Sequence, residues 1–405
     1  MSPFYARSLL NAILRVFRCR VGIPAKRNLL LIMIAPFLST QSLLDLSETC
    51  GIGKNLVYEV LDERNPFTWL QNLQREGQAR LAEHLQRLKG ADSSIRSREC
   101  VTICADDFTR SVRGKLGGLA HGCYSGAEGR PVYGIPVRGL VAVIGEGEEH
   151  IILDVHVVPS AKEGPGRPRY SHAEWLQTSL DRLEKVLGRN GLSMKGCYLS
   201  VDSAYATGLL AEHAVGNGLK LVSEVKASLK VRLWNLIWLS AKVYFLGLEF
   251  LNLRFFKALT GDPEVEYLRH LVEIRVYGKV LVVLCRMGGE TRRFFSTDPS
   301  MKAITLRRVV KRRWQLEQVF WNLKQLLGIP TIHNQKRNRV LVRIYLTFLL
   351  SQAVKDCVRG LNVTVRQFHR TLRRNPWPLV NEISSWSASV RPVIAGESPE
   401  AGLAA

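Results

Sequence analysis

The chain has 405 residues, and 46% of them are apolar, which excludes a mostly disordered protein and allows two or three folded domains. Its 57 lysines and arginines exceed its 35 aspartates and glutamates, so the formal net charge is +22 and the pI is near 9.9. A charge of this sign and size favours a polyanionic partner, because each phosphate that a cation neutralises releases condensed counterions. We therefore expect a nucleic acid as the partner, with an anionic membrane surface as the alternative.

The cysteine pattern and the apolar runs exclude further classes of protein. The eight cysteines are scattered, with no Cys-x-x-Cys pair and no zinc spacing, so we expect neither a zinc site nor a disulfide framework. The apolar runs at residues 29–38 and 340–354 are shorter than the roughly 20 residues that a membrane-spanning helix needs. The basic N-terminal stretch lacks the layout of a signal peptide. We therefore expect a cytoplasmic location and no membrane partner.

Residues 1–95 are expected to form a helical region. Apolar residues recur at helical spacing between residues 43 and 61, and Gly51 divides this run into two short helices. The second helix begins near Lys54 and Asn55, which is the layout of a helix-turn-helix whose second helix reads DNA. The alternative interpretation is that the two helices only pack against each other.

Strand patterns begin near residue 99 and predict a mixed sheet over residues 96–226. Runs rich in Val and Ile are bounded by turn residues, and helical patterns separate the later runs. Such alternation of strands and helices is typical of a mixed α/β sheet. The expected strands are residues 101–107, 132–144, 150–158, 197–201 and 219–225, and the expected helices are residues 173–187 and 206–216.

Residues 227–298 interrupt this order with an expected β-rich insertion. The segments 243–256 and 271–285 have strand composition, and Gly278 is expected to form a turn within the second. Helical patterns then return at residues 302–327 and 339–358, so we expect residues 299–360 to close the sheet domain. Residues 361–405 are expected to be a C-terminal tail.

Four acidic residues occupy positions where carboxylates can meet. Asp106 and Asp107 end the first predicted strand, Asp202 ends the fourth, and Glu317 lies in the middle of a predicted helix. Carboxylates at strand ends line the usual ligand crevice of such a sheet, although an Asp there can also cap the next helix. Two Asp and one Glu could hold two Mg²⁺ or Mn²⁺ ions about 3.5–4 Å apart, an arrangement that cleaves phosphodiesters.

Glu317 is set apart by its basic surroundings. Between residues 301 and 345 the chain has eleven Lys and Arg and a single acid, which is Glu317. Helical periodicity places Val310, Arg313, Glu317 and Lys324 on one face. A surface ion pair between Arg313 and Glu317 is the plain explanation. A metal ligand flanked by phosphate-binding cations is the functional one.

These motifs resemble those of the DDE transposases of bacterial insertion sequences, in the insertion-sequence-four group. The family's helix motif is Tyr-x₂-Arg-x₃-Glu-x₆-Lys, and this chain matches it at Arg313, Glu317 and Lys324 but has Val310 in the Tyr position. The family's Asp-Ser-x-Tyr motif is matched by Asp202, Ser203 and Tyr205, and its Asp-Asp-Thr motif is matched in part by residues 106–109. The resemblance covers roughly residues 100–350.

The resemblance implies an α+β fold with an RNase H-like mixed sheet, a β-rich insertion before the Glu, and a metal-dependent endonuclease and strand transferase activity. The metal ligands would be Asp202, Glu317 and either Asp106 or Asp107. The Asp-x-Thr spacing with Thr109 favours Asp107. The partner would be double-stranded DNA, at transposon ends and at the target, bound by a homodimer near the bacterial nucleoid. The expected DNA-binding residues are Lys54, Asn55, Tyr205, Lys226, Arg232, Arg313 and Lys324.

Two other functions remain open at this stage. One is an RNase H-like nuclease that does not transpose, such as a junction resolvase. The other is a catalytically inactive, transposase-derived protein that only binds DNA. The complete acidic trio argues against the second alternative, whereas Val310 in place of the family's Tyr favours it.

Overall fold

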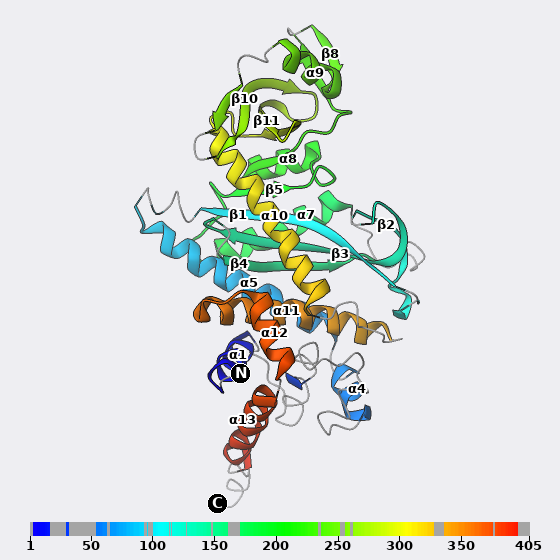
Figure 1. The fold of residues 1–405 in the computed structure, drawn as a ribbon, viewed down its shortest axis with the longest axis vertical. Helices are drawn as coiled ribbons and strands as arrows, with labels where there is room; N and C mark the ends of the chain where they lie inside the picture. The colour runs from blue at the N-terminus through cyan, green and yellow to red at the C-terminus, as the bar shows by residue number, and fades with distance from the viewer. Residues whose placement is uncertain are drawn as a thin grey trace, which may run out of the picture.

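The structure is a computed structural model, shown in Figure 1. No helix in the described part of the chain has both the length and the apolar composition needed to cross a membrane. The residues that the structure describes are 3–16, 30–31, 54–62, 65–92, 95, 100–112, 114, 116–126, 128–146, 149–160, 171–233, 236–251, 256–259, 262–327, 336–375 and 377–395.

A mixed sheet forms the centre of the molecule. Its core order is β4 (Glu149–Val157), β3 (Arg130–Ile144), β1 (Val101–Ser111), β5 (Tyr198–Val201) and β6 (Lys220–Glu224). β3 is antiparallel to β1 and β4, whereas β5 is parallel to both β1 and β6. The five strands predicted for this region are confirmed. The short strand β2 (His121–Ser125) follows the 3₁₀ turn η2 (Leu116–Gly118) and extends the outer end of β3.

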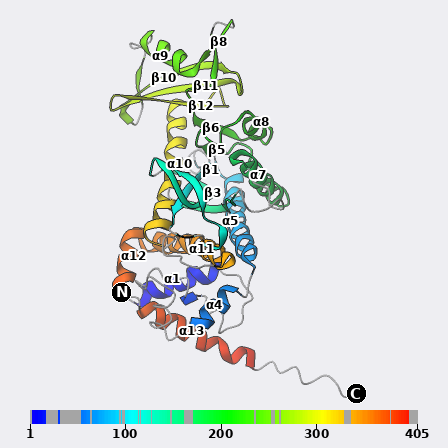
Figure 2. The same ribbon diagram turned by 90° about the vertical axis from the view of Figure 1, so that its right-hand side faces the viewer.

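Helices cover both faces of this sheet (Figure 2). Side chains alternate along β1, so Ile103 and Ala105 pack with α7 (His172–Gly188) and α8 (Gly208–Gly216) on one side, which we call the α7 face. Cys104 and Phe108 pack on the opposite side with α10 (Ala303–Gln325) and α11 (Arg337–Leu361), which we call the α10 face. All four of these helices were predicted, and the expected α+β fold class is confirmed.

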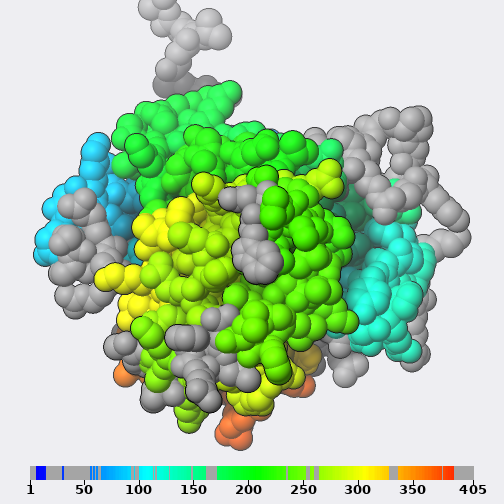
Figure 3. Space-filling view, turned by 90° about the horizontal axis from the view of Figure 1, so that it is seen from above, coloured from blue at the N-terminus to red at the C-terminus, as the bar shows by residue number. Residues whose placement is uncertain are grey.

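The β-rich insertion continues the same sheet. Its strand β12 (Glu290–Ser296) pairs with β6 of the core and with β11 (Gly278–Met287), and β11 pairs with β10 (Asp262–Ile274). Gly278 begins β11 with a φ of +69°, as the predicted turn requires. Seen from above, the insertion covers the centre of the view (Figure 3). Its remaining strands are β7 (Lys230–Leu233), β8 (Ile237–Ser240) and β9 (Lys257–Leu259).

The strand predicted at residues 243–256 was wrong, because residues Ala241–Leu251 form the helix α9. Val, Tyr and Phe in this segment favour strands by composition. The buried positions Ala241 and Phe245 are four residues apart, with Tyr244 and Leu248 partly buried against the same cluster. That spacing defines one helical face, so packing onto the sheet overrode the local preference.

The first and last segments of the chain pack together around α11. Helix α1 (Pro3–Val16) contacts both α11 and α13 (Trp377–Ala395), and α12 (Val365–Arg374) contacts α11. The C-terminal tail prediction therefore needs correction, because Phe368, Leu372 and Ile383 are buried in the same core as the sheet. Helix α4 (Lys54–Asp62) also contacts α11. The first helix of the expected helix-turn-helix lies outside the described residues.

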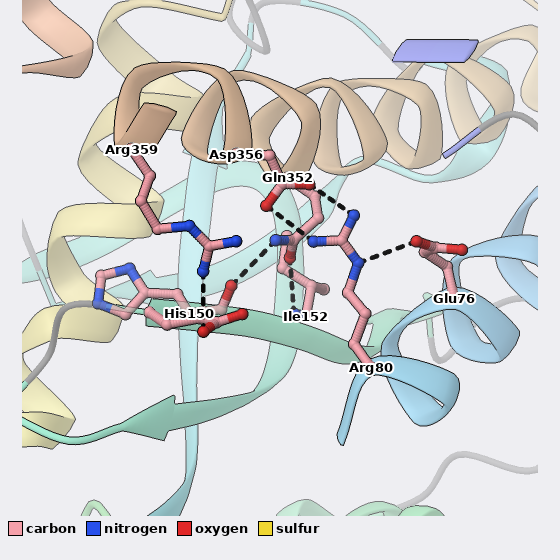
Figure 4. A network of polar contacts seen from close by, with 8 residues as sticks. Glu76, Arg80, His150, Ile152, Gln352, Asp356 and Arg359 are labelled. Atoms are coloured by element: carbon pink, nitrogen blue, oxygen red, sulfur yellow. Dashed lines mark hydrogen bonds and ion pairs between the residues drawn. The ribbon is translucent and has the colours of Figure 1, made fainter. Parts of the chain in front are cut away.

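Helix α5 (Pro66–Lys89) belongs to the sheet domain, not to a separate N-terminal domain, because it packs along β4. At the same edge of β4, Gln352 of α11 pairs with the strand's backbone (Figure 4). The Ile152 N–H donates to Gln352 Oε1 over 3.1 Å, and Gln352 Nε2 donates to the His150 carbonyl over 3.1 Å. A side-chain amide thus satisfies backbone groups of a strand whose ladder partner among the described strands is β3.

Close packing of α5 on β4 leads to a prediction about Gly77. A Cβ atom at this position would lie far inside van der Waals contact with the Ile152 carbonyl oxygen. We expect Gly77→Ala to lower the free energy of unfolding by about 1–3 kcal/mol, although alanine is the better helix former. Urea denaturation measures this, with Gly90→Ala as the control, because a Cβ at Gly90 meets open space. Equal stability of both variants would contradict the packing.

Candidate active site

Asp106 and Asp202 lie side by side at the centre of the sheet. β1 and β5 are parallel, and Ala105 pairs with Val201 at the end of β5. The next residue on each strand is one of the two aspartates, so the register brings the carboxylates to neighbouring positions. The prediction that β1 ends at Asp106 and Asp107 was wrong, because β1 continues to Ser111, but the register still places Asp106 beside the end of β5.

The two adjacent aspartates of β1 point to opposite faces. Asp106 Oδ2 accepts a hydrogen bond from Arg313 Nη1 of α10 over 2.7 Å, so Asp106 lies on the α10 face. Asp107 lies on the α7 face, where its carboxylate is 3.8 Å from Nε2 of His172 at the start of α7. Because side chains alternate along a strand, only one of the two can face α10. The geometry favours Asp106 over Asp107, which the motif spacing had preferred.

Glu317 meets Asp106 through a shared guanidinium. Arg313 Nη1 is 2.7 Å from Asp106 Oδ2 and 3.6 Å from Glu317 Oε1. The two carboxylate oxygens are therefore no farther apart than the sum of these distances. Arg313 and Asp106 are largely buried, whereas the Glu317 side chain is 55% exposed. Glu317 thus lies on the solvent side of this charged cluster, and Asp106 lies on its buried side.

The electrostatics of this cluster are dominated by desolvation. Burial raises the pKa of Asp106 to about 6, and the negative charges of Asp107 and Asp202 act in the same direction. The Arg313 guanidinium and the Asp107 backbone N–H lower the pKa of Asp106, and neither offsets the burial. A carboxylate held at such a cost in free energy is typical of a functional site.

The donor set suits a hard divalent cation, since Asp106, Asp202 and Glu317 offer only carboxylate oxygens. In the described part of the chain, however, no three His, Cys, Asp or Glu side chains stand close enough together to hold a metal ion. The positive group between Asp106 and Glu317 is Arg313. The donor chemistry fits a divalent cation, but the three carboxylates would have to draw closer together and Arg313 would have to leave its place between Asp106 and Glu317.

Lys324 lies farther along the same helix. Its Nζ is 4.9 Å from the centroid of the Phe108 ring, and that ring packs 4.7 Å from Phe320. Burial lowers the pKa of Lys324, and the charge of Glu128 opposes this shift. The predicted face of α10 therefore does carry Arg313, Glu317 and Lys324 toward the same side of β1.

Several predicted DNA contacts have other surroundings in the structure. Tyr205 is fully buried and packs edge-on against His172 with ring centroids 4.8 Å apart, so it does not fit a direct contact with DNA. Arg232 pairs with Glu273 over 3.1 Å. Lys226 is half-buried after β6, and Asn55 is exposed on α4, whereas the side chain of Lys54 lies outside the described atoms. Val310 is buried beside the insertion sheet.

Sequence reasoning missed the role of Arg312. This side chain is buried, and its Nη1 donates to Thr102 Oγ1 over 3.0 Å and to the Cys100 carbonyl over 3.4 Å. It therefore anchors α10 to the start of β1, while the next residue, Arg313, reaches the strand's aspartate. Nothing in the run Lys311-Arg312-Arg313 distinguishes the buried arginine from its neighbours, because periodicity is a weak guide for adjacent residues of one type.

A family model described as the transposase DDE domain matches residues 147–352, slightly more than half of the chain. The chain belongs to this family. The match includes Asp202 and Glu317 and confirms the resemblance to DDE transposases, and the RNase H-like sheet agrees with it. It begins after Asp106 and Asp107, and it does not identify the insertion-sequence-four group. No curated protein matches the chain.

The Arg313–Asp106 contact leads to a prediction about stability. Arg313→Ala leaves Asp106 without its cationic partner in a desolvated site, so we expect the free energy of unfolding at pH 7.5 in EDTA to fall by about 2–3 kcal/mol. Urea denaturation provides the measurement. Arg308→Ala is the matched control, because its pair with Glu146 is exposed and is worth under about 1 kcal/mol. Similar decreases in the free energy of unfolding for both variants would show that the Arg313–Asp106 pair stabilises the fold no more than an exposed ion pair does.

Proposed function

We propose that this transposase cuts DNA at transposon ends and joins the ends to target DNA by metal-dependent phosphoryl transfer at Asp106, Asp202 and Glu317. The observation that carries the proposal is the meeting of Asp106 and Glu317 on one guanidinium, next to the strand end that bears Asp202. Family membership supports DNA as the substrate, as does the net charge of +22.

Each residue of the cluster has a distinct part in this proposal. Asp106, Asp202 and Glu317 would hold divalent cations, either Mg²⁺ or Mn²⁺. The full site would hold two of these ions. When bound, such ions activate a water or a 3′-hydroxyl and neutralise charge on the transferred phosphate. Arg313 balances the carboxylates before DNA arrives and can turn to a phosphate, for which a guanidinium is well suited. Lys324 would hold the backbone on the far side of Phe108.

The other functions are less well supported. A junction resolvase is disfavoured by the match to the transposase family. An inactive DNA-binding protein would not need Asp106 and Glu317 on one guanidinium beside the strand end of Asp202, with the pKa of Asp106 raised to about 6. This chain has Val310 where the family has a tyrosine, and Val310 is buried beside the insertion sheet. Phosphate binding at this point would therefore rest on Arg313 and Lys324. Because an element has two ends, we propose that a homodimer assembles on DNA.

The first test concerns Glu317. Glu317→Gln keeps the shape of the side chain and removes the charge that a divalent ion requires, so strand cleavage in Mg²⁺ should fall by orders of magnitude. DNA affinity should hold or rise slightly, because one charge that repels phosphates is lost. Lys324→Ala should instead weaken DNA binding and lower its salt slope by about one unit. Wild-type cleavage by the Gln variant would favour a non-catalytic DNA-binding protein.

The second test separates the adjacent aspartates of β1. We expect Asp106→Asn to abolish strand cleavage, because Asp106 shares the α10 face with Glu317, whereas Asp107→Asn should retain most of it. Cleavage of a labelled transposon-end duplex in Mn²⁺ measures both, and thermal unfolding checks that both variants are folded. The opposite ranking would return the ligand role to Asp107.

A further inference from the structure

A cleft separate from the acidic cluster opens between α10, α11 and the start of α12. Its volume is about 590 Å³, and its floor is the stretch of β4 that Gln352 pairs with. Amide side chains of Gln315, Gln318 and Asn322 line the α10 side. Figure 2 shows α12 beside the place where α10 and α11 meet. The described lining contains no acidic residue.

Cations stand on two sides of this cleft. Lys355 of α11 is half-buried, and Arg366 in the first turn of α12 is exposed. Neither forms an ion pair with any residue that the structure describes, in contrast to the neighbouring Arg359, which pairs with Glu149 over 2.8 Å. Burial and the charge of Arg359 lower the pKa of Lys355, so the site would gain from an anion. Arg370 and Arg374 continue the exposed cationic face of α12 away from the cleft.

An exposed aromatic ring connects the cleft to the candidate active site. Trp321 lines the cleft and is 41% exposed, which is unusual for the largest apolar side chain. It follows Glu317 by four residues on α10, so the two side chains are neighbours about 6 Å apart along the helix axis. Trp321 therefore lies next to Glu317 on α10 and also lines the cleft that Lys355 and Arg366 border.

We propose that this cleft binds an unpaired segment of a DNA strand, with a base stacked on Trp321 and phosphates held by Lys355 and Arg366. The proposal rests on the proposed function and adds a single-strand subsite to it. A cationic groove with an aromatic platform is the combination that single-stranded nucleic acids require. Bases in a duplex already stack on each other, so they gain nothing from the ring. Amide groups in the lining can bond to base edges without selecting one sequence.

Binding measured without metal tests this subsite independently of cleavage. Fluorescence anisotropy in EDTA compares a forked DNA that has a single-stranded arm with a blunt duplex of the same paired sequence. Wild-type protein should prefer the fork. Trp321→Ala should weaken fork binding by about tenfold and leave duplex binding unchanged, and Trp321→Phe should recover most of the loss. Lys355→Ala and Arg366→Ala should each lower the salt slope for the fork by about 0.7.

Matched controls come from outside the cleft. Trp377→Ala removes an exposed tryptophan of α13, and Lys279→Ala removes an exposed cation of the insertion. Both should bind fork and duplex as the wild type does. Equal losses on fork and duplex for Trp321→Ala, or no loss on the fork, would overturn the subsite. Unimpaired cleavage by Glu317→Gln would instead overturn the proposed function and leave the fork comparison to decide the cleft.

Discussion

The contact between Arg313 and Asp106 is the interaction on which the site depends, because it joins the long helix α10 to the central strand of the sheet. An ion pair in a desolvated place persists only when its geometry is good and its neighbours hold both partners. Arg312 provides that support from the adjacent position, through its bonds to Thr102 and Cys100. Arg312 and Arg313 therefore fix where α10 lies along β1 and which of its faces points to the strand. The position of Glu317 relative to Asp106 depends on that placement.

The same contact offsets the charges of the acidic residues in the structure. The charges of Asp107 and Asp202 disfavour the ionised form of Asp106, and burial adds to the free-energy cost of that charge. Arg313 offsets part of this cost by standing between Asp106 and Glu317. A guanidinium can exchange a carboxylate for a phosphate at little cost, since it bonds to both in the same planar geometry. In the proposed function, a phosphate that takes up Arg313 would release the oxygens of Asp106 and Glu317.

Helix α10 contacts different parts of the molecule along its length and on its different sides. Its first half packs on the insertion sheet through Leu306, Val309 and Val310, and its second half packs on the core through Leu316 and Phe320. The side with Glu317 faces the strand aspartates, and the amide-lined cleft opens on another side toward α11 and α12. One helix thus borders both the proposed cleavage site and the proposed single-strand subsite, so the two share a rigid frame.

The sequence by itself determined the order of the core strands and helices along the chain, because that order depends on local periodicity. It also singled out Asp106, Asp107, Asp202 and Glu317 and the basic character of α10, because these depend on composition and position. Tertiary structure alone decided that Asp106 and not Asp107 faces α10, since adjacent strand residues look alike until a helix covers one face. Packing also made α9 a helix, drew α12 and α13 into the core, and buried Tyr205 and Arg312. Such outcomes depend on contacts between residues far apart in the chain, and local sequence patterns do not predict those contacts.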